Sequence, residues 1–479
     1  MRILMISSEA VPFSKSGGLA DVASSLSIAL SELDNDVRLI IPNYGVTDSS
    51  SFKKLAKSIE VPMAGTLEKV DILYKKMKKV GVYLIDHPIF SERKGIYGKT
   101  SFTPYPDNLT RYTLMSKVAL ALPKMLDWQP DILHCHDWTT GFIPFMARSE
   151  KMSEHTTTVF TIHNLAYQGE YPRLDMLITD MKCDSNMLND TTIDARVNMM
   201  KSGLTHADII TTVSPTYAKE IQGEEQGYGL ETLLKNKNNR LFGILNGIDL
   251  DEWNPEKDGL LDYHFSVDQM ENKALLKEEI QKRFNLPIRA DVPLISMISR
   301  IAEQKGFYEL TQGSPSPLEQ ILTELNVQVI IIGTGDSKIE EKLIALSQLH
   351  ENLSVNLIFS NEAAHLVEAG SDFFLMPSRY EPCGLNQMYS MRYGTIVIAR
   401  KTGGLADSII DVGEVDGTGF LFDEISGSAM FESVQRAISL YYENREEFEA
   451  IRKRDMEVDF SWTASALEYM KVYNTIIKG

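Results

Sequence analysis

Lys15, Gly17 and Gly18 have the residue types and spacing of a phosphate-binding turn. They lie in Lys15-Ser-Gly-Gly-Leu-Ala-Asp21, between a short apolar run and a segment whose apolar residues recur at helical spacing. Glycine has no Cβ, so phosphate oxygens can approach the backbone N–H groups, and the start of a helix favours negative charge. Lys15 would add a positive charge beside them. An ordinary strand-to-helix connection is also compatible with this stretch alone.

Three further polar residues follow apolar runs in the first half of the chain. Asp137 comes after the run at residues 131–134, and His163 and Asn164 come after the run at residues 158–162. Ligands of open parallel sheets bind beyond the carboxyl ends of the strands. We therefore expect these three side chains to lie at the same sheet edge as Lys15.

Two patterns could indicate a metal ion. His134 and His136 form a His-x-His pair, which is an element of zinc sites, and Asp249-Leu-Asp251 resembles the acid-x-acid pattern of some metal–nucleotide sites. No complete ligand set accompanies the histidines, and the two aspartates follow an Asn-Gly turn to which they can belong. The sequence predicts no metal ion and no other cofactor.

In the second half, Arg300 and Lys305 follow another apolar run. The rigid guanidinium of an arginine makes bidentate phosphate contacts, and a lysine supplies a flexible charge, so the two could neutralise a diphosphate. An Arg and a Lys five residues apart are also common on a solvated surface.

Two later segments add candidates. In Ser378-Arg-Tyr-Glu-Pro-Cys-Gly-Leu-Asn-Gln387, Glu381 could accept hydrogen bonds from sugar hydroxyls. The backbone N–H groups of Gly384 and Leu385 could meet a phosphate, because a helix is expected to begin at Gly384. The segment Lys401-Thr-Gly-Gly-Leu-Ala-Asp407, which contains Gly403 and Gly404, repeats the pattern of the first glycine turn. This repetition indicates either duplicated ancestry or a shared need for a ligand to reach the backbone.

Apolar runs that alternate with helix-length segments must position these residues, and they fall into two series. Such alternation favours parallel sheets covered by helices on both faces. We expect domains at residues 1–245 and 246–456, because turn signals cluster at residues 246–259, with a last helix at 457–479 that packs back on the first domain. The runs lie at residues 3–6, 37–41, 80–85, 131–134, 158–162, 208–213 and 242–245, and at 294–298, 327–332, 355–359, 373–376 and 395–399.

Composition excludes several classes of protein. The 479 residues include 48 Lys and Arg against 66 Asp and Glu, and this net charge of −18 disfavours nucleic acid and membrane surfaces as partners. The three cysteines are too few for a disulfide framework. The first apolar run is too short for a signal peptide, and no apolar stretch is long enough to span a membrane. We expect a cytoplasmic protein.

Taken in order, these motifs resemble the bacterial glycogen synthase and plant starch synthase family of retaining glucosyltransferases. The resemblance implies an α/β fold with two Rossmann-like, doubly wound domains facing a deep cleft, the GT-B architecture. It also implies ADP-glucose as donor and an α-1,4-glucan as acceptor. It is carried by residues 15–22, 136–138, 161–169, 212–215, 244–249, 253–255, 299–306, 378–387, 402–407 and 459–462.

The resemblance also implies roles for individual residues. Transfer would be a front-face displacement in which the leaving phosphate helps to deprotonate the acceptor 4-hydroxyl. Cys383 is expected to pack or to position the backbone, because glucosyl transfer needs no thiol. The implied catalytic residues are Asp137, His163, Arg300, Lys305 and Glu381, and the implied substrate-binding residues are Lys15, Gly17, Gly18, Asp21, Asn164, Asn246, Cys383, Gly384, Leu385, Gly403 and Gly404.

Some positions depart from the family pattern, and two alternatives follow from weaker likenesses. Ser16 and Asn386 replace the usual threonines, and Tyr389 stands where wider retaining relatives carry a second glutamate, which disfavours a generic hexosyltransferase. The alternatives are a UDP-glucose-dependent transferase of the sucrose or trehalose synthase type and a catalytically silent glucan-binding protein. The intact Lys15, Arg300 and Glu381 argue against lost chemistry.

Overall fold

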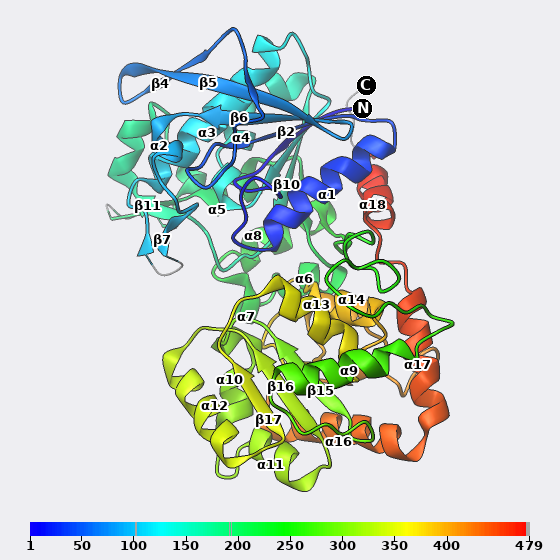
Figure 1. Ribbon diagram of the computed structural model, residues 1–479. Helices are drawn as coiled ribbons and strands as arrows, with labels where there is room; N and C mark the ends of the chain where they lie inside the picture. Colours follow the sequence, from blue (N-terminus) through cyan, green and yellow to red (C-terminus); the bar gives the residue numbers. More distant parts are fainter. Residues whose placement is uncertain (101–102, 191, 193, 476–479) are drawn as a thin grey trace. The chain divides into compact units, whose positions relative to one another are not determined.

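The chain forms two compact units. The computed structural model describes residues 1–100, 103–190, 192 and 194–475. Unit 1 consists of Met1–Gly247 together with the segment that begins at Trp462, and unit 2 is Ile248–Ser461 (Figure 1). The chain thus leaves unit 1 and returns to it. These divisions lie a few residues beyond the expected boundaries at 245/246 and 456/457.

Unit 1 is built on a sheet in the order β14-β13-β10-β9-β1-β2-β6-β5-β3, with β4 paired to β5. The strands from β14 to β6 are parallel, and β3, β4 and β5 run antiparallel to their neighbours. The described strands are β1 (Arg2–Ile6), β2 (Asp36–Pro42), β3 (Lys53–Lys54), β4 (Ile59–Met63), β5 (Thr66–Met77), β6 (Val80–Asp86), β9 (Ile132–His136), β10 (Thr157–Ile162), β13 (Ile209–Thr212) and β14 (Leu241–Gly243), with two small pairs, β7 (Gly98–Thr100) with β8 (Thr103–Pro104) and β11 (Glu170–Pro172) with β12 (Arg196–Asn198).

Helices cover this sheet, and the last of them comes from the far end of the sequence. Helix α18 packs on α1, and its Trp462, Ala466 and Tyr469 belong to the same buried cluster as Ile3 and Leu26. The helices of unit 1 are α1 (Gly18–Glu32), α2 (Pro88–Ser91), α3 (Asn108–Met125), α4 (Ile143–Ser149), α5 (Met199–His206), α6 (Pro215–Glu220), α7 (Glu224–Gly227), α8 (Glu231–Asn236) and α18 (Trp462–Asn474), with 3-10 turns η1 (Trp138–Thr140), η2 (Met152–Glu154), η3 (Arg173–Thr179), η4 (Ser185–Met187) and η5 (Asn238–Arg240).

Unit 2 is a parallel sheet in the order β17-β16-β15-β18-β19-β20. Its strands are β15 (Leu294–Ile298), β16 (Gln328–Ile332), β17 (Leu353–Asn356), β18 (Phe373–Met376), β19 (Ile396–Arg400) and β20 (Gly419–Phe422). Its helices are α9 (Asn272–Arg283), α10 (Phe307–Thr311), α11 (Pro317–Glu324), α12 (Ser337–Leu349), α13 (Asn361–Gly370), α14 (Asn386–Arg392), α15 (Gly403–Ser408), α16 (Gly427–Glu443) and α17 (Arg445–Glu457), with the 3-10 turn η6 (Glu303–Lys305).

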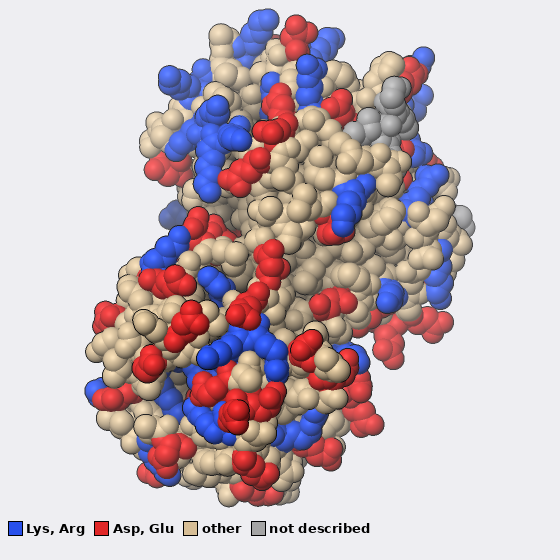
Figure 2. Space-filling model, turned by 90° about the vertical axis from the view of Figure 1, so that its right-hand side faces the viewer, with Lys and Arg blue, Asp and Glu red and all other residues tan. Residues whose placement is uncertain are grey.

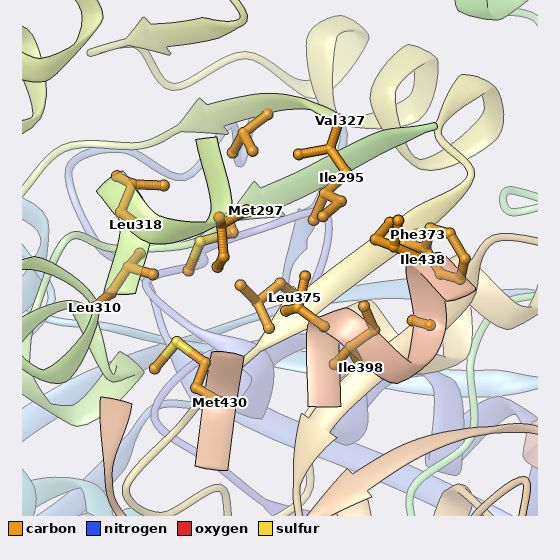
Figure 3. Packing of buried hydrophobic residues seen from close by; sticks show 14 of the residues in the cluster. Ile295, Met297, Leu310, Leu318, Val327, Phe373, Leu375, Ile398, Met430 and Ile438 are labelled. Carbon is orange, nitrogen blue, oxygen red and sulfur yellow. The ribbon is translucent and has the colours of Figure 1, made fainter. Parts of the chain in front are cut away.

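The core of unit 2 lies where apolar side chains of the central strands meet those of α10, α11 and α16. Figure 3 shows Met297 and Leu375 from the sheet close to Leu310 and Met430 from the helices, and all four are buried. Continuous apolar strands of this kind are those expected for a sheet covered on both faces. Residues on the opposite face of these strands, such as Ile330, Phe374 and Val397, are buried as well, which confirms the predicted doubly wound sheet in this half of the chain.

Some local predictions were wrong. Strand β17 ends at Asn356, and Phe359, predicted to end that strand, is fully exposed. The helix expected to begin at Gly384 begins at Asn386, because Gly384 has a φ of +74° and Leu385 caps the helix. Strand β20 and the antiparallel strands β3, β4 and β5 were not predicted.

The surface carries charges of both signs. On the face seen in Figure 2, acidic and basic side chains are interspersed rather than gathered by sign. Within the described part of the chain, no helix combines the length and the apolar character that crossing a membrane requires.

Candidate active site

The first glycine turn follows β1 and leads into α1. Gly17 is the N-cap residue of α1, and a Cβ built on it would meet no atom within 4 Å, so the backbone there is open to a ligand. The Nζ of Lys15 lies 2.9 Å from Oδ1 of Asp21, and the lysine side chain is 55% exposed. Exposed ion pairs of this kind add little stability, so a phosphate could take over this ammonium at small cost.

A buried carboxyl group that the sequence analysis missed lies against this turn. Glu9 accepts hydrogen bonds from the backbone N–H of Ser16 and from the hydroxyl of Tyr97, whose oxygen lies 3.2 Å from Oε1. Burial raises the pKa of Glu9 to about 7. Its position directly after an apolar strand was the available signal. These contacts tie the glycine turn to the body of unit 1.

Asp137 and His163 lie together, as their places after β9 and β10 predicted. The two strands are parallel neighbours, with Thr161 paired to His136. Asp137 has a φ of +59°, an uncommon value for a residue with a side chain. Its Oδ1 accepts the backbone N–H of His163 at 2.9 Å. Desolvation raises the pKa of Asp137 to about 7, although backbone N–H donors oppose this shift.

The imidazole of His163 forms a hydrogen bond with that of His136. Nδ1 of His136 lies 2.9 Å from Nε2 of His163, and burial lowers the pKa of His163 to about 3. Both rings are therefore neutral near pH 7. In the described residues no cluster of three or more His, Cys, Asp or Glu side chains could hold a metal ion.

Two asparagines near this edge differ in their surroundings. Oδ1 of Asn164 accepts the backbone N–H of Ala166 at 3.0 Å, which fixes the loop after β10. Asn246 is buried after β14, and its Oδ1 has no partner among the described residues. A buried carbonyl oxygen without a partner is costly, and a ligand hydroxyl could satisfy it.

In unit 2, the loops after the neighbouring strands β15 and β18 bring Lys305 and Glu381 together. Nζ of Lys305 lies 2.5 Å from Oε2 of Glu381, which also accepts the hydroxyl of Ser378 at 3.0 Å. Gly306 permits this approach, because its φ is +78° and a Cβ there would lie 2.1 Å from the carbonyl oxygen of Pro377. Arg300 is exposed, and its Nη2 lies 3.3 Å from Oε1 of Gln304, the residue before Lys305.

The second glycine turn packs against the segment that carries Glu381. A Cβ on Gly403 would lie 1.9 Å from the carbonyl oxygen of Glu381, and one on Gly404 would lie 2.0 Å from that of Cys383. The N–H of Gly404 also donates to the carbonyl of Glu381 at 3.0 Å. These glycines differ from Gly17, because protein backbone already fills the space beside them.

Each unit therefore holds one group of predicted residues at the carboxyl edge of its parallel strands. In unit 1 the group surrounds Asp137 and the first glycine turn, and in unit 2 it surrounds Glu381. Sequence reasoning missed Glu9, Tyr97 and the supporting role of His136.

Comparisons with known proteins cover the whole chain. Residues 2–236 match the family described as "Starch synthase catalytic domain", and residues 278–455 match "Glycosyl transferases group 1". The chain is 39% identical to a glycogen synthase from Treponema denticola and 40% identical to one from Geotalea daltonii, over 100% of this chain and 99% of each relative.

Two solved structures are similar in fold. The catalytic domain of starch synthase IV from Arabidopsis thaliana, bound to ADP and acarbose, superposes with a TM-score of 0.88 and 31% identity over 99% of both chains. A sucrose-phosphate synthase from Thermosynechococcus elongatus superposes with a TM-score of 0.61 over 99% of this chain and 98% of its own, but at 16% identity it shows the fold alone.

Two Rossmann-like units with polar groups at the carboxyl edges of their parallel strands define a GT-B-type glycosyltransferase. The chain belongs to the family of glycogen and starch synthases. The family resemblance and the fold class predicted from the sequence are confirmed, and the match favours this family over the sucrose or trehalose synthase alternative.

Proposed function

We propose that this chain is a glycogen synthase that transfers glucose from ADP-glucose to the non-reducing-end 4-hydroxyl of an α-1,4-glucan, with retention of configuration and release of ADP. The observation that carries the proposal is the full-length identity of about 40% to glycogen synthases. ADP in the similar starch synthase supports the choice of nucleotide. The free cysteines Cys135, Cys183 and Cys383 fit work in the cytoplasm.

The residues of unit 2 act on the leaving group and the sugar. Lys305 and Arg300 stabilise the diphosphate that departs, and Glu381 accepts hydrogen bonds from the glucose hydroxyls. The backbone N–H groups of Gly384 and Leu385 add donors for phosphate oxygens. Fixed donors aimed at developing charge are the largest single contribution in many enzymes.

The candidate residues of unit 1 bind the nucleotide sugar and the acceptor. Lys15, Gly17 and Gly18 bind the nucleotide sugar, with Asp21 holding the lysine in place. His163 and Asp137 face the glucose and the acceptor, while Asn164 and Asn246 supply further polar contacts.

The chemistry of these groups favours front-face displacement over a double displacement. A retaining enzyme with a covalent intermediate needs an ionised carboxylate as nucleophile. Oε2 of Glu381 is engaged by Lys305 and Ser378, and Oδ1 of Asp137 is engaged by the backbone N–H of His163. The leaving phosphate itself then accepts the proton of the 4-hydroxyl as the new bond forms.

One assay tests the proposal. Purified protein is incubated with glycogen and either ADP-glucose or UDP-glucose, and nucleotide release and glucan growth are measured together. We expect ADP release with matching polymer growth, and much slower release of UDP. Preference for UDP-glucose would overturn the choice of donor, release without polymer growth would overturn chain elongation, and no release from either donor would overturn the transferase reading.

A further inference from the structure

His136 contacts the ring of His163, and this contact restricts how His163 can bind a ligand. His136 is fully buried at the end of β9, where its ring stacks on that of His134 with centroids 4.3 Å apart and planes at 26°. Its Nδ1 lies 2.9 Å from Nε2 of His163. Among the described residues, the ring of His136 therefore has one hydrogen bond, and that bond is to a predicted catalytic side chain.

The neighbouring ring of His134 is satisfied without His136. Its Nδ1 lies 2.7 Å from the hydroxyl of Tyr473 on α18, and its Nε2 lies 2.6 Å from Oγ1 of Thr161. With both nitrogens of His134 occupied, the two rings can only stack. The stacking fixes the plane of His136, and the hydrogen bond fixes the ring of His163.

The bond between the two histidines has two possible directions, since both rings are neutral. If Nε2 of His163 donates, His136 must carry its own proton on Nε2. That nitrogen is buried and has no partner among the described residues. Orphaned N–H groups in protein interiors are rarer than acceptors with an unused lone pair. The contacts therefore favour the other direction, in which Nδ1–H of His136 donates.

We propose that His136 is a positioning residue that, by donating its Nδ1–H to Nε2 of His163, makes His163 present its own Nδ1–H as a hydrogen-bond donor to the substrate. The second nitrogen of a functional histidine is commonly set in this way by an outer partner. His163 is only partly buried, and its Nδ1 has no partner in the described part of the chain. Such a donor suits a sugar hydroxyl or a phosphate oxygen, and the substrate class itself rests on the proposed function.

Nuclear magnetic resonance tests the tautomer without any substrate. The full-length protein is labelled with 15N-histidine, and the His163 signals are assigned by their loss in His163→Asn. We expect a protonated Nδ1 and an unprotonated Nε2 on His163, and a change in this pattern in His136→Leu. A His163 ring with its proton on Nε2 in the wild-type protein would overturn the proposal, whatever the activity of the enzyme.

Kinetics tests whether His136 acts through His163. Removal of the outer partner of a functional histidine costs about 10- to 100-fold in metal sites, where this has been measured. We expect His136→Leu to lower kcat on that scale with KM for the donor nearly unchanged, and His136→Asn, which can restore a side-chain hydrogen bond, to recover most of it. In a His163→Ala background, His136→Leu should cost nothing further.

A matched control separates positioning from damage to the fold. His206 is another buried histidine of unit 1, and its ring nitrogens bond Ser202 and Asp184. We expect His206→Gln to keep wild-type kcat. An equal loss of kcat in His136→Leu whether or not His163 is present would overturn the proposal, and so would a loss that tracks only the fraction of folded protein.

Discussion

Lys305 is the single residue with the clearest electrostatic task in the proposed reaction. Its ammonium is partly exposed and lies 2.5 Å from the carboxylate of Glu381, so a diphosphate can share it. Removal of one preorganised donor typically lowers turnover by about 100- to 1,000-fold. We expect that loss in Lys305→Ala, and a similar one in Arg300→Ala, measured as kcat with ADP-glucose and glycogen.

The control is a lysine of the same unit without a place in the site. Lys342 is exposed on α12, and Lys342→Ala should keep wild-type kcat. The folded state of each variant is checked by circular dichroism. Near-normal turnover in folded Lys305→Ala would remove this residue from the mechanism.

Glu9 makes stability depend on pH. Burial raises its pKa from 4.5 to about 7. Between these two pH values the folded protein keeps a proton that the unfolded chain releases. The free energy of unfolding therefore falls as the pH rises through this window. The shift corresponds to about 3 kcal/mol.

Glu9→Gln should remove this dependence. The variant cannot lose a proton there. The unfolding free energy of the variant minus that of the wild type should therefore increase by about 3 kcal/mol between pH 4.5 and pH 8. Asp137 titrates in the same range, and the charge of Glu9 contributes to its raised pKa. The difference between the two proteins therefore contains the titration of Glu9 and, in the same direction, its smaller coupling to Asp137. Urea unfolding at several pH values measures it. A difference that does not change with pH would contradict the assignment.

At the scale of elements, the two glycine turns share a sequence pattern but differ in their packing. Gly17 faces open space, whereas Gly404 packs against the backbone of Cys383. An added methyl group in filled space typically costs about 1–3 kcal/mol. We expect Gly404→Ala to lower the unfolding free energy by that amount. We expect Gly17→Ala to lower the unfolding free energy by less than about 1 kcal/mol, the cost of alanine in place of glycine at an N-cap, but to raise KM for the nucleotide sugar.

The two variants act as controls for each other. Denaturant unfolding and initial-rate kinetics are measured for both. Equal destabilisation would show that the Gly17 turn is also packed, and unchanged kinetics in Gly17→Ala would remove it from donor binding.

Regular elements were more predictable from the sequence than special ones. Continuous apolar runs predicted most parallel strands, because burial on both faces demands them. The lysine-rich β3 and β5 were missed because exposed antiparallel strands have no continuous apolar run. The late start of α14 depends on the φ of Gly384, which no pattern specifies.

The candidate site was predictable at the level of strand ends. The positions of Asp137, His163 and Glu381 follow from the rule that ligands meet the carboxyl edges of parallel strands. The contacts that hold them were not predictable, because the bond of His136 to His163 depends on the register between β9 and β10. The packing role of Gly403 likewise depends on its close approach to the backbone of Glu381, which the residues around Gly403 do not specify.

At the scale of the whole molecule, unit 2 is an insertion whose two ends lie side by side. The N–H of Ile248 donates to the carbonyl of Phe460 at 2.8 Å, and Ile248 pairs with Ser461. One buried cluster of unit 2 runs from Ile295 to Ile451, and all of its described members belong to unit 2. We expect residues 248–461, produced alone, to fold and to unfold cooperatively in urea.

The complementary fragment should behave differently. Residues 1–247 lack α18, and their core would lose Trp462, Ala466 and Tyr469. We expect this fragment to show no cooperative unfolding transition by circular dichroism. Addition of residues 462–479 after residue 247 through a short linker should restore one. A stable fragment 1–247 would contradict the structural role given to α18.

The return of α18 to unit 1 also sets an order of events during synthesis on the ribosome. Unit 1 begins the chain, but its core is completed by its last helix. Between them the ribosome must produce all of unit 2, which at about 5–20 residues per second takes on the order of ten seconds or more. During this time the apolar surface that α18 covers in unit 1 stays exposed. Unit 2 can therefore finish folding before unit 1. Shielding of that surface by chaperones would matter most in this interval.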